Sequence, residues 1–224
     1  MLFRSSTAVR IPSGTIFGME GSLLRPVPSL TDLSLLFSPQ KVYNLPASLT
    51  SGYSTGKFMV PSGRIIKLNG SDTIYLLGDD KYLWAVGTLR EVNAATRWVP
   101  NGLQLDSSNV DSIGTKAYTS IIKNGGNYYA VQPDGSARLL PGAILNSQKD
   151  DSAMPIAGPI ANKVPFDTRA IRFIYINGTI FSLEGSVIRP IANFSTYSAM
   201  GGDSNNTIQV NSSANSIFNI GSTL

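Results

Sequence analysis

The chain has 224 residues and a net charge of +4, with 42% hydrophobic and only 14% charged residues. It contains neither Cys nor His, which excludes disulfides and thiolate chemistry and removes the commonest metal ligand and the commonest neutral-pH base. No two basic residues are adjacent and no apolar run is long enough to cross a bilayer, so neither nucleic-acid binding nor membrane insertion is expected.

Ser, Thr, Asn and Gly fill most of the remaining positions. A surface rich in hydroxyls and amides suits extracellular or particle-bound proteins. The N-terminal stretch lacks the long apolar core and the cleavage site of a signal peptide. We therefore expect a mature fragment, a protein exported by another route, or a part of a virus particle.

The first predicted elements are a strand at residues 6–14 and a β-hairpin at residues 15–26, which reads TIFGMEGSLLRP. Aromatic and β-branched residues suit its two arms, and Glu20-Gly21 supplies the turn. Residues 29–37 form a short segment that could be helical, and a stretch with Pro and Gly follows.

The second predicted hairpin covers residues 72–86, after a strand at residues 63–71 that contains the turn signal Asn-Gly. Residues 88–98 are predicted to be helical. Thr88 and Glu91 have the spacing of a capping box, in which each side chain caps a backbone N–H of the other residue.

The third predicted hairpin, residues 126–141, turns at Asp134-Gly135, the strongest of the four turn signals. The fourth, residues 179–190, reads TIFSLEGSVIRP and shares eight of its twelve letters with the first. Upstream strands are expected at residues 118–126 and 171–179.

This recurrence predicts an internal repeat. Thr15, Thr73, Asn127 and Thr179 mark equivalent points, which are 58, 54 and 52 residues apart. The chain then divides into four units of about 55 residues, at approximately 5–56, 57–115, 116–168 and 169–224. A single unit cannot bury its apolar face alone, so the units must pack on one another.

The predicted fold is all-β, with three to four strands in each unit and less than about a fifth of the residues in helices. A propeller-like ring is favoured because the terminal units show no polar caps, which a linear array needs for solubility. A linear array of small sheets is the alternative. In both, Phe17, Tyr75, Tyr129 and Phe181 should be equivalent and lie in or near the core.

Candidate binding residues share one slot of the repeat. Arg25, Arg138 and Arg189 align with Trp84, so a ring would hold acidic groups or sugars, with Trp84 and its neighbour Tyr82 as a stacking platform. The alternative is that the same local packing holds this slot in every hairpin. The complete predicted set is Arg25, Tyr82, Trp84, Trp98, Arg138 and Arg189.

Tyr and Trp near loops are typical of glycan-binding surfaces, although ordinary core and interface aromatics give the same pattern. The residues expected to be exposed are Tyr53, Tyr82, Trp98, Tyr118 and Tyr197. The paired acids at residues 79–80 and 150–151 lack the calcium-loop pattern. Adjacent acids on a turn point apart, so a pair cannot flank a glycosidic bond without a carboxylate from elsewhere in the chain. We predict no catalytic residue, no metal and no cofactor.

The pattern of a Tyr- or Phe-containing apolar strand, a Gly turn and then Arg-Pro-Val or Arg-Pro-Ile resembles a short β-hairpin repeat of bacterial surface and wall-associated proteins. Residues 15–29 and 179–193 match it well, residues 72–86 match in their first half, and residues 127–142 match loosely. The resemblance implies an extracellular, non-enzymatic role in display or attachment, and it supplies no catalytic residues.

The predicted function is a structural or adhesive surface module, in a virion tail, fibre or injection apparatus or in a cell-surface assembly. Its expected partners are other structural proteins, within an oligomeric assembly in a virion or at the cell surface. A lectin-like module that binds cell-surface glycans is the alternative. A glycoside hydrolase of propeller fold ranks third because no convergent carboxylates can be placed.

Overall fold

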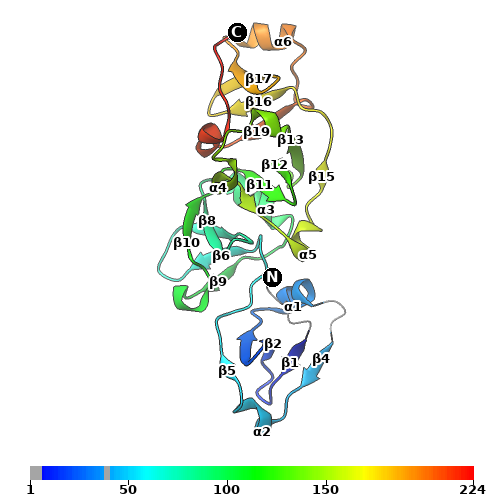
Figure 1. Cartoon of the computed structure of the whole chain (residues 1–224), viewed down its shortest axis with the longest axis vertical. Coiled ribbons are helices and arrows are strands. Elements are labelled where there is room, and N and C mark those ends of the chain that lie inside the picture. Colours follow the sequence, from blue (N-terminus) through cyan, green and yellow to red (C-terminus); the bar gives the residue numbers. More distant parts are fainter. Residues whose placement is uncertain (1–6, 38–40) are drawn as a thin grey trace.

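The computed structural model describes residues 7–37 and 41–224. Strands contain 35% of the residues and helices 21%, which confirms the all-β class and puts the helical share just above the expected ceiling of about a fifth. The strands form three five-stranded sheets and one four-stranded sheet. These sheets follow one another along the long axis of an elongated molecule (Figure 1).

All four sheets follow one connection pattern. Three consecutive strands form an antiparallel meander. A first crossover leads to a strand parallel to the first one, and a second crossover leads back to the third strand, again in parallel. We call each sheet with its two crossovers a module, at residues 8–55, 65–117, 121–167 and 173–221.

The first module contains β1 (Ala8–Arg10), β2 (Ile16–Glu20), β3 (Leu23–Pro26), α1 (Leu30–Leu36), β4 (Val42–Asn44), α2 (Ala47–Thr50) and β5 (Ser54–Thr55). The second contains β6 (Ile65–Leu68), β7 (Ile74–Leu77), β8 (Tyr82–Val86), α3 (Leu89–Thr96), β9 (Leu103–Leu105), the 3-10 turn η1 (Ser107–Asn109) and β10 (Gly114–Ala117).

The third module contains β11 (Ile121–Asn124), β12 (Asn127–Val131), β13 (Ala137–Leu140), η2 (Gly142–Ile144), α4 (Lys149–Ser152), β14 (Met154–Pro155), α5 (Gly158–Ala161) and β15 (Phe166–Asp167). The fourth contains β16 (Phe173–Ile176), β17 (Thr179–Glu184), β18 (Val187–Pro190), α6 (Phe194–Ala199), β19 (Thr207–Val210) and η3 (Ser212–Ile217). A parallel bridge between Ile188 and Ile220 takes the place of its fifth strand.

Polar caps start the helices of the first crossover. Ser29, Thr88 and Asn193 each accept a hydrogen bond from the backbone N–H three residues later. The predicted capping box of Thr88 and Glu91 is confirmed at α3. These caps satisfy N–H groups that have no partner inside the helix.

The hairpins of the four modules share one register. Phe17 on β2 lies opposite Val9, the second residue of β1, and Tyr75, Tyr129 and Phe181 lie opposite the second residue of β6, β11 and β16. The predicted equivalence of these positions is therefore confirmed. The two Phe rings are buried and the two Tyr rings are half-buried.

Successive residues of a strand point to opposite sides, so each module has two faces. We call the side of the four aromatic positions face 1 and the other side face 2. In β11, Ile122 on face 1 packs with the second module, whereas Ile121 on face 2 packs with the fourth module. The third sheet is therefore buried on both sides, which explains its nearly continuous apolar strands.

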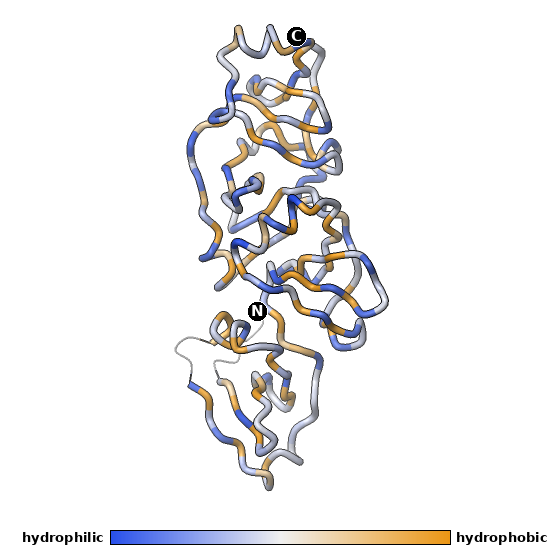
Figure 2. The backbone as a smooth tube through the Cα atoms, turned by 180° about the vertical axis from the view of Figure 1, so that it is seen from behind, coloured by the Kyte–Doolittle hydropathy of each residue, from blue (hydrophilic) through white to orange (hydrophobic). Residues whose placement is uncertain are grey.

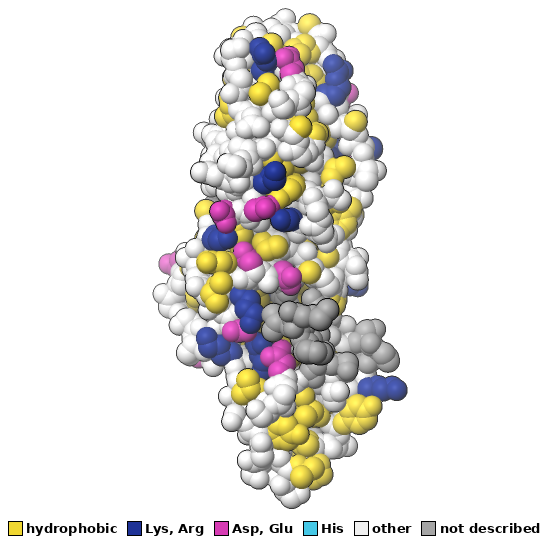
Figure 3. Space-filling view, viewed as in Figure 1, with side chains coloured by type: hydrophobic (Ala, Val, Ile, Leu, Met, Phe, Trp, Pro, Cys, Tyr) yellow, Lys and Arg dark blue, Asp and Glu magenta, His cyan; other side chains and the backbone are white. Residues whose placement is uncertain are grey.

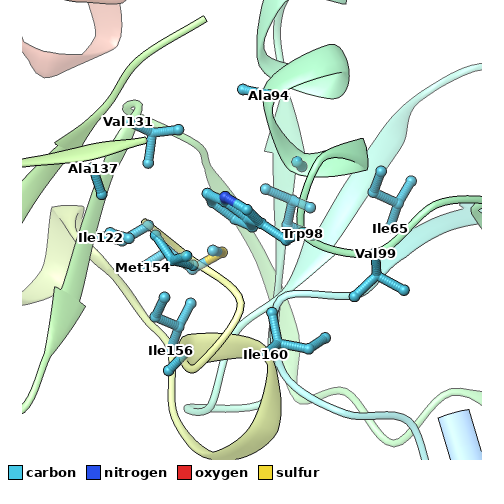
Figure 4. Packing of buried hydrophobic residues seen from close by; sticks show 14 of the residues in the cluster. Ile65, Ala94, Trp98, Val99, Ile122, Val131, Ala137, Met154, Ile156 and Ile160 are labelled. Carbon is cyan, nitrogen blue, oxygen red and sulfur yellow. The ribbon is translucent and has the colours of Figure 1, made fainter. Parts of the chain in front are cut away.

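One apolar cluster joins the second and third modules (Figure 4) and also includes Leu35 of α1 in the first module. Trp98, just after α3, lies between Val99 and Ile65 of its own module and Val131 and Met154 of the third. Hydrophobic and hydrophilic segments both occur along the whole tube (Figure 2). The three meander strands of the second module, IIKL, IYLL and YLWAV, are mostly apolar, and both faces of this sheet are buried: Ile66 packs with the linker and Ile65 with the third module.

The favoured propeller-like ring is not found, because the first and last sheets lie at opposite ends of the column (Figure 1). Each outward face is covered by a crossover of its own module. Tyr53 packs with Phe17 on the first module, and Tyr197 of α6 meets Phe173 edge-on with ring centroids 5.0 Å apart. These covering segments are rich in Ser and Thr, so they are the polar caps that the sequence analysis did not recognise.

Candidate functional site

The four residues of the predicted shared slot occupy one register position. Arg25 lies opposite Gly18 on β2, and Trp84, Arg138 and Arg189 lie opposite the residue that follows the aromatic position of their own modules. This position is on face 2, the side of the following module. The four side chains are spread along the column, so their predicted convergence on one ring is wrong.

Arg25 and Arg138 each connect one module to the next. The Nη2 atom of Arg25 lies 3.2 Å from Asp111 Oδ2 of the second module. Arg138 pairs with Asp167 of its own module at 3.2 Å and donates from Nη1 to the carbonyl oxygen of Asn205 in the fourth module at 2.6 Å. Both guanidinium groups are engaged in joints between modules.

Arg189 lies in the last of the four described modules, and its recorded partners belong to that module and to the segment after it. Its Nε lies 2.9 Å from Glu184 Oε2, and its Nη1 donates to Ser222 Oγ at 3.1 Å. Its side chain is 35% exposed, against 13% for Arg25 and 8% for Arg138. The side chain at this repeat position is therefore more exposed in the fourth module than in the first and third.

Trp84 belongs to the core and not to a stacking platform. Its side chain is 0% exposed, and its indole N–H donates to Asp80 Oδ1 at 3.3 Å. The half-buried Tyr82 ring is covered by the ammonium group of Lys116, 4.3 Å from its centroid. The predicted platform is therefore already occupied by side chains of the same module.

Trp98 is also buried, and its Nε1 donates to the carbonyl oxygen of Gly135 in the third module at 2.7 Å. Tyr118 and Tyr197 are buried too, so the prediction of exposed aromatics is wrong for these three residues. Burial, followed by the charge of Glu91, raises the pKa of Tyr118 well above its ordinary value. Tyr53 is half-buried.

A buried ion pair that the sequence analysis missed joins the first two modules. Arg64, just before β6, places Nε 2.9 Å from Asp32 Oδ1 on α1, and the two side chains are 2% and 0% exposed. Arg64 also donates to the carbonyl oxygen of Pro100. The Ser29 cap at the start of α1 marks Asp32 as a helix-start residue, but no sequence signal identifies its distant partner.

Glu91 forms a second polar junction, at which three modules meet. One carboxylate oxygen accepts from the backbone N–H groups of Gly87 and Thr88, at 3.2 and 3.1 Å. The other accepts from Ser120 Oγ, next to the third module, and from Asn211 Nδ2 of the fourth module. Glu91, which the sequence predicts only as a helix cap, therefore also binds a residue next to the third module and a residue of the fourth module.

The linker between the first two modules lies inside their joint. Phe58 and Val60 pack with the cluster of the second module, whereas Met59 between them packs with Leu33 and Phe37 of the first. This alternation is what an extended segment produces when it is inserted between two surfaces. Besides the linker, Leu35 of α1 enters the apolar cluster that the second and third modules share.

A cavity of about 170 Å³ lies beside this linker. Its walls are mainly apolar, and charged side chains of both modules line its edge. Asp111 at this edge lies 2.7 Å from Lys81 Nζ. A hydrogen bond from Lys81 and the charge of Arg25 hold the pKa of Asp111 below its ordinary value, although burial opposes the shift.

One acid of each predicted pair has a structural partner. Asp80 accepts from the backbone N–H of Tyr82, and Asp150 pairs with Lys123 at 2.9 Å. Within residues 7–37 and 41–224, no group of three or more acidic side chains has the arrangement of a metal site. Charged side chains of both signs gather over α4 and around the first joint, on a face that otherwise shows few charges (Figure 3).

Large apolar side chains are exposed at one recurring position, the first residue of the first crossover helix. Leu30, Leu89 and Phe194 start α1, α3 and α6 and are 74%, 77% and 71% exposed. Gly142 starts η2 in the third module. No sequence signal marks these residues as exposed, although each directly follows a helix cap.

No family model matches the chain, and no curated protein matches it. Among solved structures, it is similar to a chain of the periplasmic assembly from the ESX-5 inner membrane complex. The similarity covers 97% of this chain and 92% of that chain, with 9% sequence identity and a TM-score of 0.24. A TM-score this low carries no argument about function. Within the described residues, no helix is long and apolar enough to cross a membrane.

Proposed function

We propose that the chain is a non-enzymatic structural component of a multi-protein surface or particle assembly, in which it acts as a spacer that presents apolar side chains to partner proteins. The observation that carries the proposal is the exposure of Leu30, Leu89 and Phe194 at one position of three modules. A single exposed apolar residue needs no explanation, but recurrence at one structural position points to a shared contact.

Helix capping does not require these side chains, although the Phe194 ring also packs on Tyr197 with ring centroids 5.5 Å apart. The preceding Ser, Thr or Asn provides the helix cap, so a polar residue at the first helical position would serve equally well. Burial against a partner would instead stabilise the complex by about 1.5–3 kcal/mol for each fully covered side chain. The column spaces these contacts along its length.

The charged residues support the same role. Arg25, Asp32, Arg64, Glu91 and Arg138 all hold one module to another. The low charge, the hydroxyl- and amide-rich composition and the absence of Cys support a setting in a virion or at a cell surface. We propose no glycan site, because the aromatic residues that suggested one are largely buried.

The test replaces Leu30, Leu89 and Phe194 together by Ser in the full chain. In the source organism the unmodified protein should sediment in a complex far larger than its own 23.9 kDa, whereas the variant should sediment as the free chain. Thermal unfolding should be nearly unchanged, because exposed side chains contribute little to stability.

The matched control replaces Tyr43 and Leu49, both 56% exposed but outside the recurring position, by Ser. This control should assemble normally. Normal assembly of the triple variant, or an equal loss of assembly in the control, would contradict the proposal.

A further inference from the structure

The cavity at the first joint is formed by three modules and the linker. Its apolar walls include Leu36 on α1, Met59 in the linker, Leu77 on β7 and Pro159 on α5. Its volume of about 170 Å³ is close to that of an engineered apolar cavity of about 150 Å³ that takes up benzene. There is room for one hydrocarbon group of side-chain size.

The charges at the edge of the cavity are matched except for one. Arg25 pairs with Glu20 at 3.1 Å and with Asp111 at 3.2 Å, and Lys81 pairs with Asp111 at 2.7 Å. Asp79 also lines the cavity, is exposed, and forms no ion pair with any described residue. The unmatched charge at the edge is therefore negative.

Two cations near the edge leave the Asp79 carboxylate without an ion-pair partner among the described residues. Arg25 is fully engaged, because it also donates to the carbonyl oxygens of Lys57 and Phe58. The charge of Lys57, which does not line the cavity, acts on Asp111. Asp79 remains the carboxylate to which an incoming cation would be attracted.

We infer that this cavity binds the side chain of a lysine from a partner protein. The four methylene groups lie against the apolar walls, and the ammonium group stays at the wet edge beside Asp79, the arrangement in which long basic side chains usually bury their stems. A carboxylate in the same place would be repelled by Asp79. The inference rests on the proposed assembly function in one respect, namely that the lysine belongs to a partner protein. Binding of an alkylamine to the cavity can be tested without any partner protein.

The test titrates the full-length chain with n-pentylamine, which carries the lysine stem and charge, and with 1-pentanol and pentanoate. Methyl resonances of Met59 and Leu77 report binding in NMR spectra. We expect saturable shifts with the amine, weaker binding of the alcohol and no binding of the carboxylate. Replacing Ala157, which lines the cavity, by Leu should fill it and abolish the shifts.

Asp79→Asn should weaken amine binding about threefold, the size expected for an exposed ion pair, and leave pentanol binding unchanged. The matched control is Asp72→Asn, which removes an exposed carboxylate of the same module and should change nothing. Unchanged amine affinity in Asp79→Asn, or equal binding of pentanoate, would overturn the assignment of the ligand charge.

Absence of methyl shifts with every probe would overturn the site itself. Nuclear Overhauser contacts from Leu2 or Phe3 to the Met59 methyl group would show that the chain fills the cavity with its own residues, and would overturn the inference as well. The triple Ser variant of Leu30, Leu89 and Phe194 should bind pentylamine normally. Failure of the assembly test for the proposed function can therefore be distinguished from failure of the pentylamine-binding test.

Discussion

At the joint between the second and third modules, apolar side chains of both modules form one cluster, in which Trp98, Met154 and Ile160 are 3%, 0% and 0% exposed. At the joint between the first and second modules, the buried Asp32–Arg64 pair and an inserted linker form most of the contact, and Leu35 of α1 is the residue of the first module that enters the shared cluster among the described residues. Modules that share one strand connection pattern are therefore joined by different contacts, mainly apolar packing at one joint and a buried ion pair with a linker at the other.

This difference determines how the molecule should unfold. Apolar burial across the second, third and fourth modules couples them, so they should lose structure together. A buried ion pair fixes orientation, but the cost of desolvating its charges offsets most of its attraction. The first module has its own clusters around Leu33 and Phe17, and among its described buried residues it contributes only Leu35 to the cluster of the second and third modules. It should therefore open as a separate unit.

The largest effect is expected for Trp98→Ala. Removing this ring creates a cavity and leaves the Gly135 carbonyl oxygen without its indole donor, which should lower the free energy of unfolding by about 4 kcal/mol. Urea denaturation followed by circular dichroism measures this loss. Phe194→Ala, which removes an exposed ring, is the control and should change stability by less than about 0.5 kcal/mol.

Arg64→Met should cost about 3 kcal/mol, because it leaves the carboxylate of Asp32 buried without its partner. The cost should fall mainly on the first joint, because within the second module only the bond from Arg64 to the carbonyl oxygen of Pro100 is lost among the described side-chain contacts. Proteolysis at Lys57 in the linker should therefore become faster, whereas Trp fluorescence, which reports the second module, should keep its unfolding midpoint. Arg169→Met, at a side chain that is 70% exposed, should leave both readouts unchanged.

Glu91→Gln should cost about 2 kcal/mol, since an amide cannot accept hydrogen bonds at both of its terminal atoms. The contact with Asn211 connects the second module to the fourth. Hydrogen exchange of η3 should therefore accelerate together with that of α3. Acceleration confined to α3 would show that Glu91 acts only as a helix cap.

Acid should loosen the first joint by a smaller amount. The folded-state pKa of Asp111 is lowered, so its contribution to stability is present above about pH 4, the ordinary range of Asp, and is lost as the pH falls through the folded value. The effect should stay below about 1 kcal/mol because the side chain is partly exposed. Asp111→Asn should remove this part of the pH dependence.

Local features of the fold could be predicted from the sequence because they depend on neighbouring residues. The hairpins, the equivalence of Phe17 and Phe181 and the capping box of Thr88 follow from alternation, turn residues and helix-start spacing. The strands that return in parallel to both sides of each meander are short, and their sequences carry little alternation. They were foreseen only as one irregular strand in each unit.

The arrangement of the modules could not be predicted, because it depends on contacts between residues far apart in the chain. A column and a ring use the same hairpins, and they differ in whether the outward faces are covered by their own crossovers. The burial of Trp84 could not be predicted either. A flat side chain at a repeat position that otherwise holds Arg is compatible with a surface stacking platform and with a buried contact between modules. Nothing near Arg64 in the sequence points to Asp32 as its partner.

Native-state hydrogen exchange in increasing denaturant tests the central comparison most directly. Amides of β1, β2 and β3 should exchange through one opening, with a lower free energy and a smaller denaturant dependence than amides of β7, β12 and β17, which should share a second, larger opening. A single opening common to all four sheets would contradict the two-unit account. Earlier opening of the fourth sheet than of the first would contradict it as well.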